Sequence, residues 1–155
     1  MVVGITDIVS KKEFYNLVGD IGGTNARFAI VSKGSSELIS IKTLQCEKFE
    51  TIQQAIQFYL SSIEDIQISS ACIASAGTVH LDTFKPANND WVINKSDVSS
   101  ELNNIQVSWI NDFNAQALAT TELTDIDLIT IKAGIEQPDR LRLAIGPGTG
   151  LGVCG

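Results

Sequence analysis

A glycine-dense segment near the start of the chain, GDIGGTN at residues 19–25, constrains the fold most, because apolar runs lie on both sides of it. Residues 14–18 and 26–31 have the length and composition of strands. A third strand is expected at residues 38–44, after a turn at Gly34. Since the connections between these segments are short, they predict an antiparallel meander.

The hydrophobic period changes after this meander. Apolar side chains recur at helical spacing in residues 51–60, and the runs at 71–74 and 105–110 are typical of buried parallel strands. The second run leads into an alanine-rich helix expected at residues 113–120, for which Asp112 is the available N-cap. Meander strands followed by helix–strand units predict an α/β fold with a mixed five-stranded sheet and flanking helices.

The acidic balance of the chain argues against several classes of partner. Its 155 residues carry 18 Asp and Glu against 11 scattered Lys and Arg, a net charge of −7, so nucleic acid and anionic membranes are not expected. No apolar run approaches the roughly 18 residues of a membrane span, and no basic stretch precedes an apolar one at the N-terminus. Cys46, Cys72 and Cys154 lack metal-ligand spacing and lie in or beside apolar stretches. Together these features predict a reduced, cytoplasmic protein.

The patterning divides the chain into three parts. Residues 1–13 are polar and poorly patterned, and we expect them to be frayed or disordered. Residues 14–120 hold the meander and the helix–strand units of one domain. Residues 121–155 begin with a polar connector and continue with apolar strands expected at 126–131 and 141–145.

The end of the chain resembles its beginning. A strand, a glycine-dense turn and a strand surround Thr24, and the same pattern opens around Thr149. Because a chain rarely ends just as a hairpin opens, we expect the first strands of a second, truncated domain of the same kind. Its unpaired edge could bind another copy of the chain, so we expect self-association as a homodimer.

The two glycine-dense loops are candidate phosphate-binding sites. Glycine removes the side-chain obstruction and permits positive φ, so backbone N–H groups can approach a phosphate. Asp20, at the end of a strand, could hold Mg²⁺ directly or through water. Each loop alone is more simply interpreted as an ordinary glycine turn, but two loops facing each other across a cleft can clamp a polyphosphate. The candidate phosphate-binding residues are Gly19, Asp20, Ile21, Gly22, Gly23, Thr24, Gly148, Thr149 and Gly150.

A second set of candidates is suited to a sugar. Asn111 and Asp112 lie at a strand-to-helix junction, where a carboxylate stays ionised and can accept a proton from a hydroxyl. The alternative for Asp112 is a plain N-cap, which is the commoner role of an Asp at such a position. Residues 88–91, NNDW, begin with Asn88 and offer amide and indole donors suited to sugar hydroxyls. Their alternative is a polar loop around one buried Trp.

Three motifs together resemble the bacterial ATP-dependent glucokinase family. They are LVGDIGGTNAR at residues 17–27, INDFNA at 110–115 and GTGLGV at 148–153, and the match runs in order over about residues 15–155. The family belongs to the sugar kinase/actin/Hsp70 superfamily. The resemblance therefore implies a ribonuclease H-like, actin-like ATPase domain followed by a second of the same kind, with the active site between them.

The resemblance also implies phosphoryl transfer from ATP to the 6-hydroxyl of glucose, at the entry of glycolysis. Residues 19–24 resemble the first phosphate loop, with Asp20 near Mg²⁺, and residues 148–150 resemble the second. Asn111 and Asp112 look like the sugar-binding pair, in which Asp112 is the base that takes the hydroxyl proton.

Two departures from the family pattern bear on these expectations. Residues 74–78, ASAGT, lie where many relatives have a proline-containing turn near the sugar. The sequence also ends before the Glu- and His-containing segments that complete the sugar pocket and before the adenosine-binding part. The resemblance thus implies the N-terminal portion of such an enzyme, and we expect no turnover by this chain alone.

Two alternatives belong to other functional classes. A sugar-responsive repressor of the same fold would carry a helix-turn-helix before the first glycine loop, for which the residues before that loop leave no room. A nucleotide-binding regulatory or structural module without kinase activity would need no base, and Asn111 and Asp112 beside Asn88 argue against it. The sequence does not choose between glucose and a related hexose such as mannose or an N-acetylated amino sugar.

Overall fold

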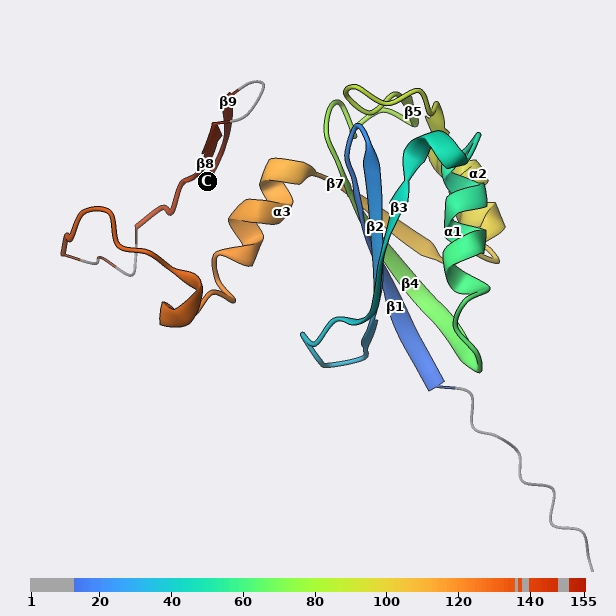
Figure 1. Cartoon of the computed structure of the whole chain (residues 1–155), viewed down its shortest axis with the longest axis horizontal. Coiled ribbons are helices and arrows are strands. Elements are labelled where there is room, and N and C mark those ends of the chain that lie inside the picture. Colours follow the sequence, from blue (N-terminus) through green and yellow to red (C-terminus); the bar gives the residue numbers. More distant parts are fainter. Residues whose placement is uncertain (1–12, 136, 138–139, 148–150) are drawn as a thin grey trace, which may run out of the picture.

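A five-stranded mixed sheet forms the centre of the computed structural model, which describes residues 13–135, 137, 140–147 and 151–155 (Figure 1). The strand order is β3-β2-β1-β4-β7. The strands are β1 (Glu13–Ile21), β2 (Asn25–Ser32), β3 (Ile39–Gln45), β4 (Ile66–Ser75) and β7 (Gln106–Asn111). The first three form the predicted antiparallel meander, and β4 and β7 continue the sheet parallel to β1. The α/β class and the mixed five-stranded sheet are therefore confirmed.

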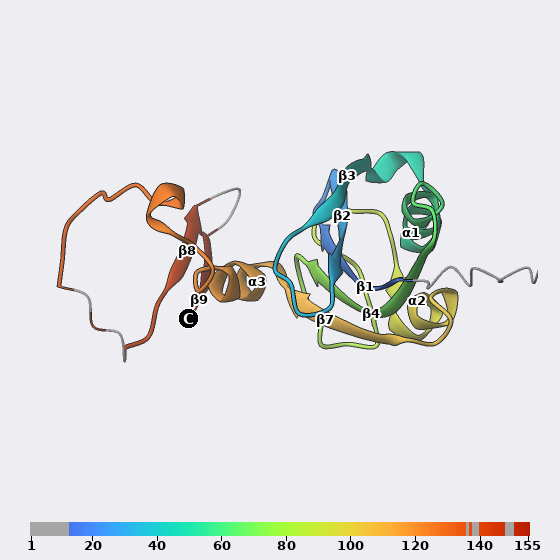
Figure 2. The same cartoon turned by 90° about the horizontal axis from the view of Figure 1, so that it is seen from below.

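Two helices, α1 (Ile52–Leu60) and α2 (Lys95–Glu101), cover one face of this sheet (Figure 1, Figure 2). α1 begins where the Thr51 side chain accepts a hydrogen bond from the Gln54 N–H, which satisfies one of the free donors of the first turn. The apolar side of α1 is buried and consists of Ile52, Ala55, Ile56 and Tyr59. The helical spacing of these residues thus predicts the observed helix correctly.

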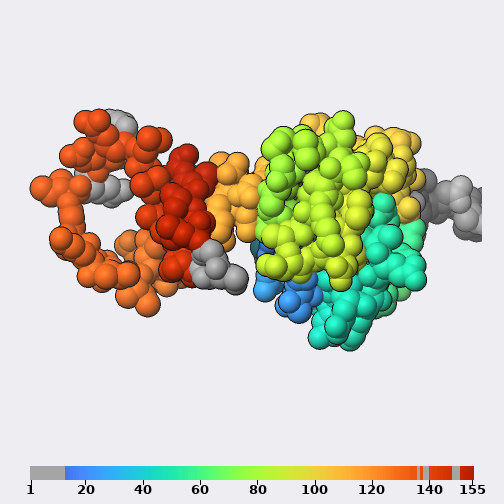
Figure 3. Space-filling model, turned by 90° about the horizontal axis from the view of Figure 1, so that it is seen from above, coloured from blue at the N-terminus to red at the C-terminus, as the bar shows by residue number. Residues whose placement is uncertain are grey.

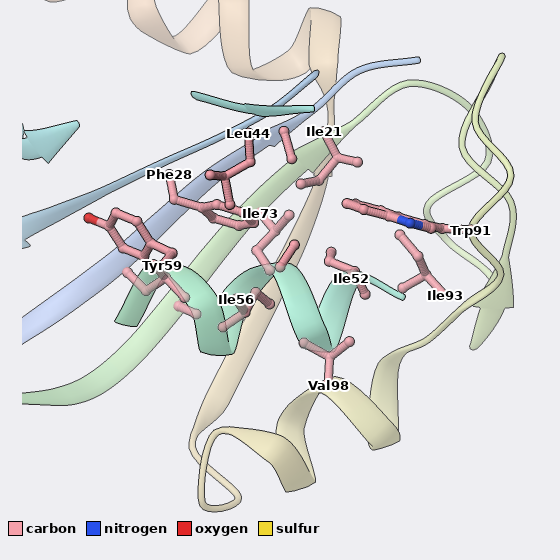
Figure 4. Close-up of a cluster of buried hydrophobic side chains, with 14 of the residues drawn as sticks. Ile21, Phe28, Leu44, Ile52, Ile56, Tyr59, Ile73, Trp91, Ile93 and Val98 are labelled. Atoms are coloured by element: carbon pink, nitrogen blue, oxygen red, sulfur yellow. The ribbon is translucent and has the colours of Figure 1, made fainter. Parts of the chain in front are cut away.

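The hydrophobic core lies between these helices and the sheet (Figure 4). Leu17 and Ile21 of β1 have no exposed surface, as expected for alternate residues that face one side of a sheet. The rings of Phe28 and Tyr59 pack with their centroids 5.5 Å apart and join β2 to α1. Removing these side chains from water is the main favourable contribution to folding.

Helix α3 (Asp112–Ala119) continues directly from β7 (Figure 1), and a smaller part of the chain, orange to red in Figure 3, follows it. It contains the antiparallel hairpin of β8 (Ala144–Pro147) and β9 (Leu151–Cys154). The remaining elements are the strand pair β5 (Thr83–Phe84) and β6 (Ile93–Asn94) and the 3₁₀ turns η1 (Cys46–Lys48) and η2 (Asp125–Asp127). Across the described ranges, no helix has the length and apolarity needed to cross a membrane.

The strand expected at residues 126–131 is wrong. The turn η2 occupies its beginning, and the rest has no regular structure. The three isoleucines of this run are more than nine-tenths exposed. The apolar pattern predicted that they would be buried, but no described residue covers them. The strand expected at 141–145 begins only at Ala144, where pairing with β9 supplies backbone hydrogen bonds.

The hydroxyl of Tyr59 is a buried polar group inside the core. It has no hydrogen-bond partner among the residues that the structure describes. Burial raises the pKa of Tyr59 from 10 to about 12, because the ionised phenolate is excluded from an apolar environment.

We predict that Tyr59→Phe keeps the fold and raises the free energy of unfolding by about 1 kcal/mol, because it removes a buried hydroxyl without a partner. Because burial disfavours the phenolate in the folded chain, this group leaves the free energy of unfolding of the wild type unchanged with pH below pH 10 and lowers it as the pH rises from 10 to 12. Urea denaturation at about pH 8 and about pH 11 should show that the free energy of unfolding falls more between these pH values in the wild type than in the variant. Equal losses in the two proteins would contradict the prediction.

Candidate active site

The hairpin of β1 and β2 brings two opposite charges together at one end of the sheet. Its antiparallel register pairs Asp20 with Arg27, and Arg27 Nη1 donates a hydrogen bond to Asp20 Oδ2 at 2.9 Å. About half of each side chain is exposed, so the pair adds little to stability and both charges remain accessible to a ligand.

Hydrogen bonds from three directions hold the first glycine loop. The Gly22 N–H donates to the Asn25 carbonyl at 2.9 Å, which closes the turn. The Cys46 N–H donates to the Thr24 carbonyl at 2.8 Å, and Asn89 Nδ2 donates to the Gly22 carbonyl at 2.9 Å. The loop is therefore fixed against η1 and residues 88–91 before any ligand binds, which favours a preformed site.

The first glycine loop does not use the positive φ that glycine permits. Positive φ values among the described glycines occur at Gly34 and Gly77, not at Gly22 or Gly23. Gly23 is required for a close approach instead, because a Cβ there would lie 2.7 Å from the Asn88 carbonyl oxygen.

The junction between β7 and α3 is capped by Asn111 rather than by Asp112. Asn111 has an extended backbone, and its Oδ1 accepts a hydrogen bond from the Phe113 N–H at 3.0 Å. Asp112 is the first helical residue, and its Oδ1 accepts from the same N–H at 3.0 Å. The prediction of Asp112 as the N-cap is thus wrong by one residue. Asn111 Nδ2 also reaches the Gly77 carbonyl at 3.5 Å.

A cavity of about 470 Å³ brings the two predicted carboxylates together. Asp20 enters it from the end of β1, and Asp112 enters it from the first turn of α3, with Arg27 beside them. The other lining residues are Val18, Gly19, Phe28, Ala29, Leu38, Ile41, Ala74, Ala115, Gln116 and Ala119. A largely apolar pocket with two carboxylates and one guanidinium can hold a polar ligand through a few directed contacts.

Asn88 lines a neighbouring cavity of about 430 Å³ with Gly23 and Thr24, and it does not line the cavity of Asp20 and Asp112. In the same loop, the Asn89 side chain binds the Gly22 carbonyl and accepts from the Trp91 N–H. The Trp91 indole donates to the Phe49 carbonyl at 2.9 Å. The alternative interpretation, a polar loop around one buried Trp, is therefore the right one for Asn89 and Trp91. Asn88 is exposed.

The remaining predicted site residues are placed as follows. The Ile21 side chain is fully buried and belongs to the core, so it offers a ligand only its backbone. Asn111 does not line the cavity, but it immediately precedes Asp112, which does. Residues 148–150, the second predicted phosphate loop, lie outside the described residues.

Arg27 lines the cavity, although its position in the sequence motif alone indicates no role for it. The signal that could have found it is the hairpin register, because pairing the strands on either side of the loop sets Arg27 opposite Asp20. A guanidinium in this position can neutralise the charge of a phosphate ligand.

The described residues contain no group of three or more His, Cys, Asp or Glu side chains that could hold a metal ion alone. The carboxylate of Asp20 at this cavity is nevertheless suitable for Mg²⁺, which is commonly bound by one or two carboxylates together with phosphate oxygens and water. The donor set therefore fits a metal that arrives with a nucleotide.

Comparisons with solved structures define the class of protein first. A ROK hexokinase from Thermus thermophilus aligns with a TM-score of 0.53 at 19% identity, covering 73% of this chain and 40% of that one. A glucokinase from an Antarctic psychrotroph aligns with a TM-score of 0.81 at 33% identity, covering 90% of this chain and 45% of that one. The fold is that of the sugar kinases, an actin-like ATPase domain of the ribonuclease H type, as the sequence predicted.

Sequence comparisons then give the family. The family described as Glucokinase matches residues 17–155. The glucokinase of Hahella chejuensis is 44% identical over 144 residues, which cover 93% of this chain and 45% of that protein. The glucokinase of Chromohalobacter salexigens is 42% identical over 139 residues, which cover 90% and 44%. The chain belongs to the glucokinase family, and it spans about half the length of the curated relatives it matches.

We predict that Gly23→Ala lowers the free energy of unfolding by about 1–3 kcal/mol, because the new methyl group must displace the Asn88 backbone. Gly22→Ala is the matched control, since its Cβ would lie 3.4 Å from the Asn25 carbonyl oxygen, and it should cost less than about 1 kcal/mol. Urea denaturation measures both variants. A control as damaging as Gly23→Ala would show that the close approach at Gly23 is not the cause.

Proposed function

We propose that this chain forms part of a glucokinase, in which the phosphoryl group of ATP is transferred to the 6-hydroxyl of glucose. The observation that carries the proposal is the shared cavity of Asp20, Arg27 and Asp112. It combines a carboxylate fit for a metal nucleotide, a cation for phosphate and a second carboxylate fit for a hydroxyl. Membership of the glucokinase family supports the same reaction.

Asp112 is proposed as the general base. It lies in the first turn of α3, and it lines the same cavity as Asp20 and Arg27. An ionised carboxylate can accept the proton of a sugar hydroxyl as that hydroxyl attacks the phosphorus. Asn111 uses its Oδ1 for the helix cap and one N–H of its Nδ2 for the Gly77 carbonyl, so the second N–H of Nδ2 is the group proposed to donate to a sugar hydroxyl.

The phosphate groups are proposed to bind at the two glycine loops, residues 19–24 and 148–150, with Arg27 beside the first. Asp20 is proposed to hold Mg²⁺ directly or through water, and a bound Mg²⁺ would neutralise charge on the transferring phosphoryl group. Phosphoryl transfer depends mainly on positioning and charge neutralisation, and the hydrogen bonds that fix the first loop serve the former.

The sugar contact of Asn88, the cellular location and the oligomeric state are further proposals. Asn88 as a sugar contact is supported only by its place beside Gly23, in the neighbouring cavity. A cytoplasmic location and a homodimer also remain predictions. Since the chain spans about 45% of its relatives, we propose that turnover needs the sequence that those relatives carry in addition.

Ligand binding by the 155-residue chain tests the first part of this proposal. Isothermal titration should detect both ATP–Mg²⁺ and glucose, and a coupled assay for glucose 6-phosphate should detect no turnover. Binding of ATP–Mg²⁺ without glucose would favour the nucleotide-binding module without kinase activity. Binding of neither ligand would contradict the preformed half-site.

We predict that Asp112→Asn weakens glucose binding by this chain about tenfold, because the variant loses a charge-assisted hydrogen bond to the hydroxyl. ATP–Mg²⁺ affinity should change by less than about threefold if Asp20 is the principal metal ligand. Asp97→Asn is the matched control, since Asp97 also lies in the first turn of a helix but away from the cavity. Titration of the three proteins measures the difference, and equal glucose affinities would remove Asp112 from the sugar site.

We predict that a chimera joining residues 13–155 to the remaining sequence of the Hahella chejuensis glucokinase is an active glucose kinase. Asp112→Asn in this chimera should lower kcat by about 10²–10⁴-fold, the range of general-base catalysis. The coupled assay measures kcat, and a kcat within about twofold of the parent chimera would exclude the base role.

A further inference from the structure

Phe113, the residue after the proposed base, has its ring on the β8–β9 hairpin. A Cβ built on Gly152 would overlap the ring atoms Cε2 and Cζ, and one built on Gly146 would lie 2.6 Å from Cζ. Gly146 and Gly152 are cross-strand partners in the hairpin. The ring therefore rests directly on a pair of glycines, in a space that a side chain at either position would occupy.

The hairpin presents its small residues to α3. Ala144, Gly146, Gly152 and Cys154 are the half-buried residues of its two strands, and the residues between them are exposed. Cys154 Sγ also donates to Asn114 Oδ1 at 3.1 Å, so two consecutive residues of α3 contact the hairpin. The small residues thus face α3 and leave room for the Phe113 ring, and the bulkier apolar residues face away from it.

This contact links two parts of the proposed site. Asp112 immediately precedes Phe113 at the start of α3, and the glycine pair is one residue pair from the loop at 148–150. We propose that Phe113 is a positioning residue, whose ring on Gly146 and Gly152 sets the place of the β8–β9 hairpin relative to the Asp112 carboxylate. The inference rests on the proposed function for its consequence, but its geometry can be tested separately.

The first experiment measures the placement of the hairpin by crosslinking the 155-residue chain. Asn114→Cys places a thiol beside Cys154, and mild oxidation should form a disulfide between them. Adding Phe113→Ala should slow this disulfide about tenfold or more, because the hairpin loses its ring contact. Asn114→Cys with Cys154→Ser is the control without the crosslink, and peptide mapping separates the product from Cys46 and Cys72. Equal rates with and without the Phe113→Ala substitution would overturn the inference.

The second experiment uses the glycine pair. If Phe113 and Gly152 share one space, the effects of substituting both should not add, whereas two unrelated losses of packing should add. Gly152→Ala should slow the Asn114→Cys crosslink as strongly as Phe113→Ala, since the new methyl group and the ring need the same space. Phe113→Ala combined with Gly152→Ala should be no slower than Phe113→Ala alone, as for residues in direct contact. Additive slowing would overturn the shared-space argument.

The third measurement connects the placement to ligands. Phe113→Ala should weaken ATP–Mg²⁺ binding by this chain about tenfold and leave glucose affinity within about twofold, because the hairpin loses its place relative to Asp112 while Asp112 keeps its own place at the end of β7. Phe113→Leu should recover most of the loss by filling the same space, and an equal loss for both ligands would overturn the inference. A wild-type chain that binds no nucleotide would refute the proposed function, whereas the crosslinking rates would still decide the role of Phe113.

Discussion

The burial of Leu17 and Ile21 on one face of β1 is the constraint on which the rest of the structure depends. β1 pairs with β2 on one side and with β4 on the other, so its register sets both neighbours. A slip by one residue would bring Asp20 into the core and expose these two side chains, which the hydrophobic effect opposes. The apolar residues of β1 therefore hold Asp20 opposite Arg27 at the cavity.

The parallel strands explain why the remaining site residues lie nearby. β1, β4 and β7 run in the same direction, so their carboxyl ends meet at one edge of the sheet. Asp20 lies at the end of β1, and Asn111 and Asp112 lie at the end of β7. Ligands of open α/β sheets bind outside the carboxyl ends of the strands, and the cavity of this chain follows that rule.

The sequence predicted the features that depend on local pattern. Apolar runs with short connections predicted the meander, helical spacing predicted α1, and further apolar runs predicted β4 and β7. It placed Asp112 one residue wrong because Asn and Asp are equally good caps, and only the extended backbone of Asn111 decides between them. It predicted a strand at 126–131 because an apolar run indicates a tendency to be buried. Such a run does not show whether a neighbouring strand is present to pair with it. It missed the role of Arg27, which depends on pairing across the hairpin.

The absence of any buried side chain along α3 has a consequence for the distribution of stability. Amides of β1 and β4 pair in the middle of the sheet and should exchange with solvent only on global unfolding, whereas those of α3 can exchange through local opening. We therefore expect Asp112 to lie in a segment that opens before the central sheet, which holds Asp20. The carboxylate proposed for the proton thus lies on a segment that a ligand can order, while the one proposed for the metal nucleotide is fixed in advance.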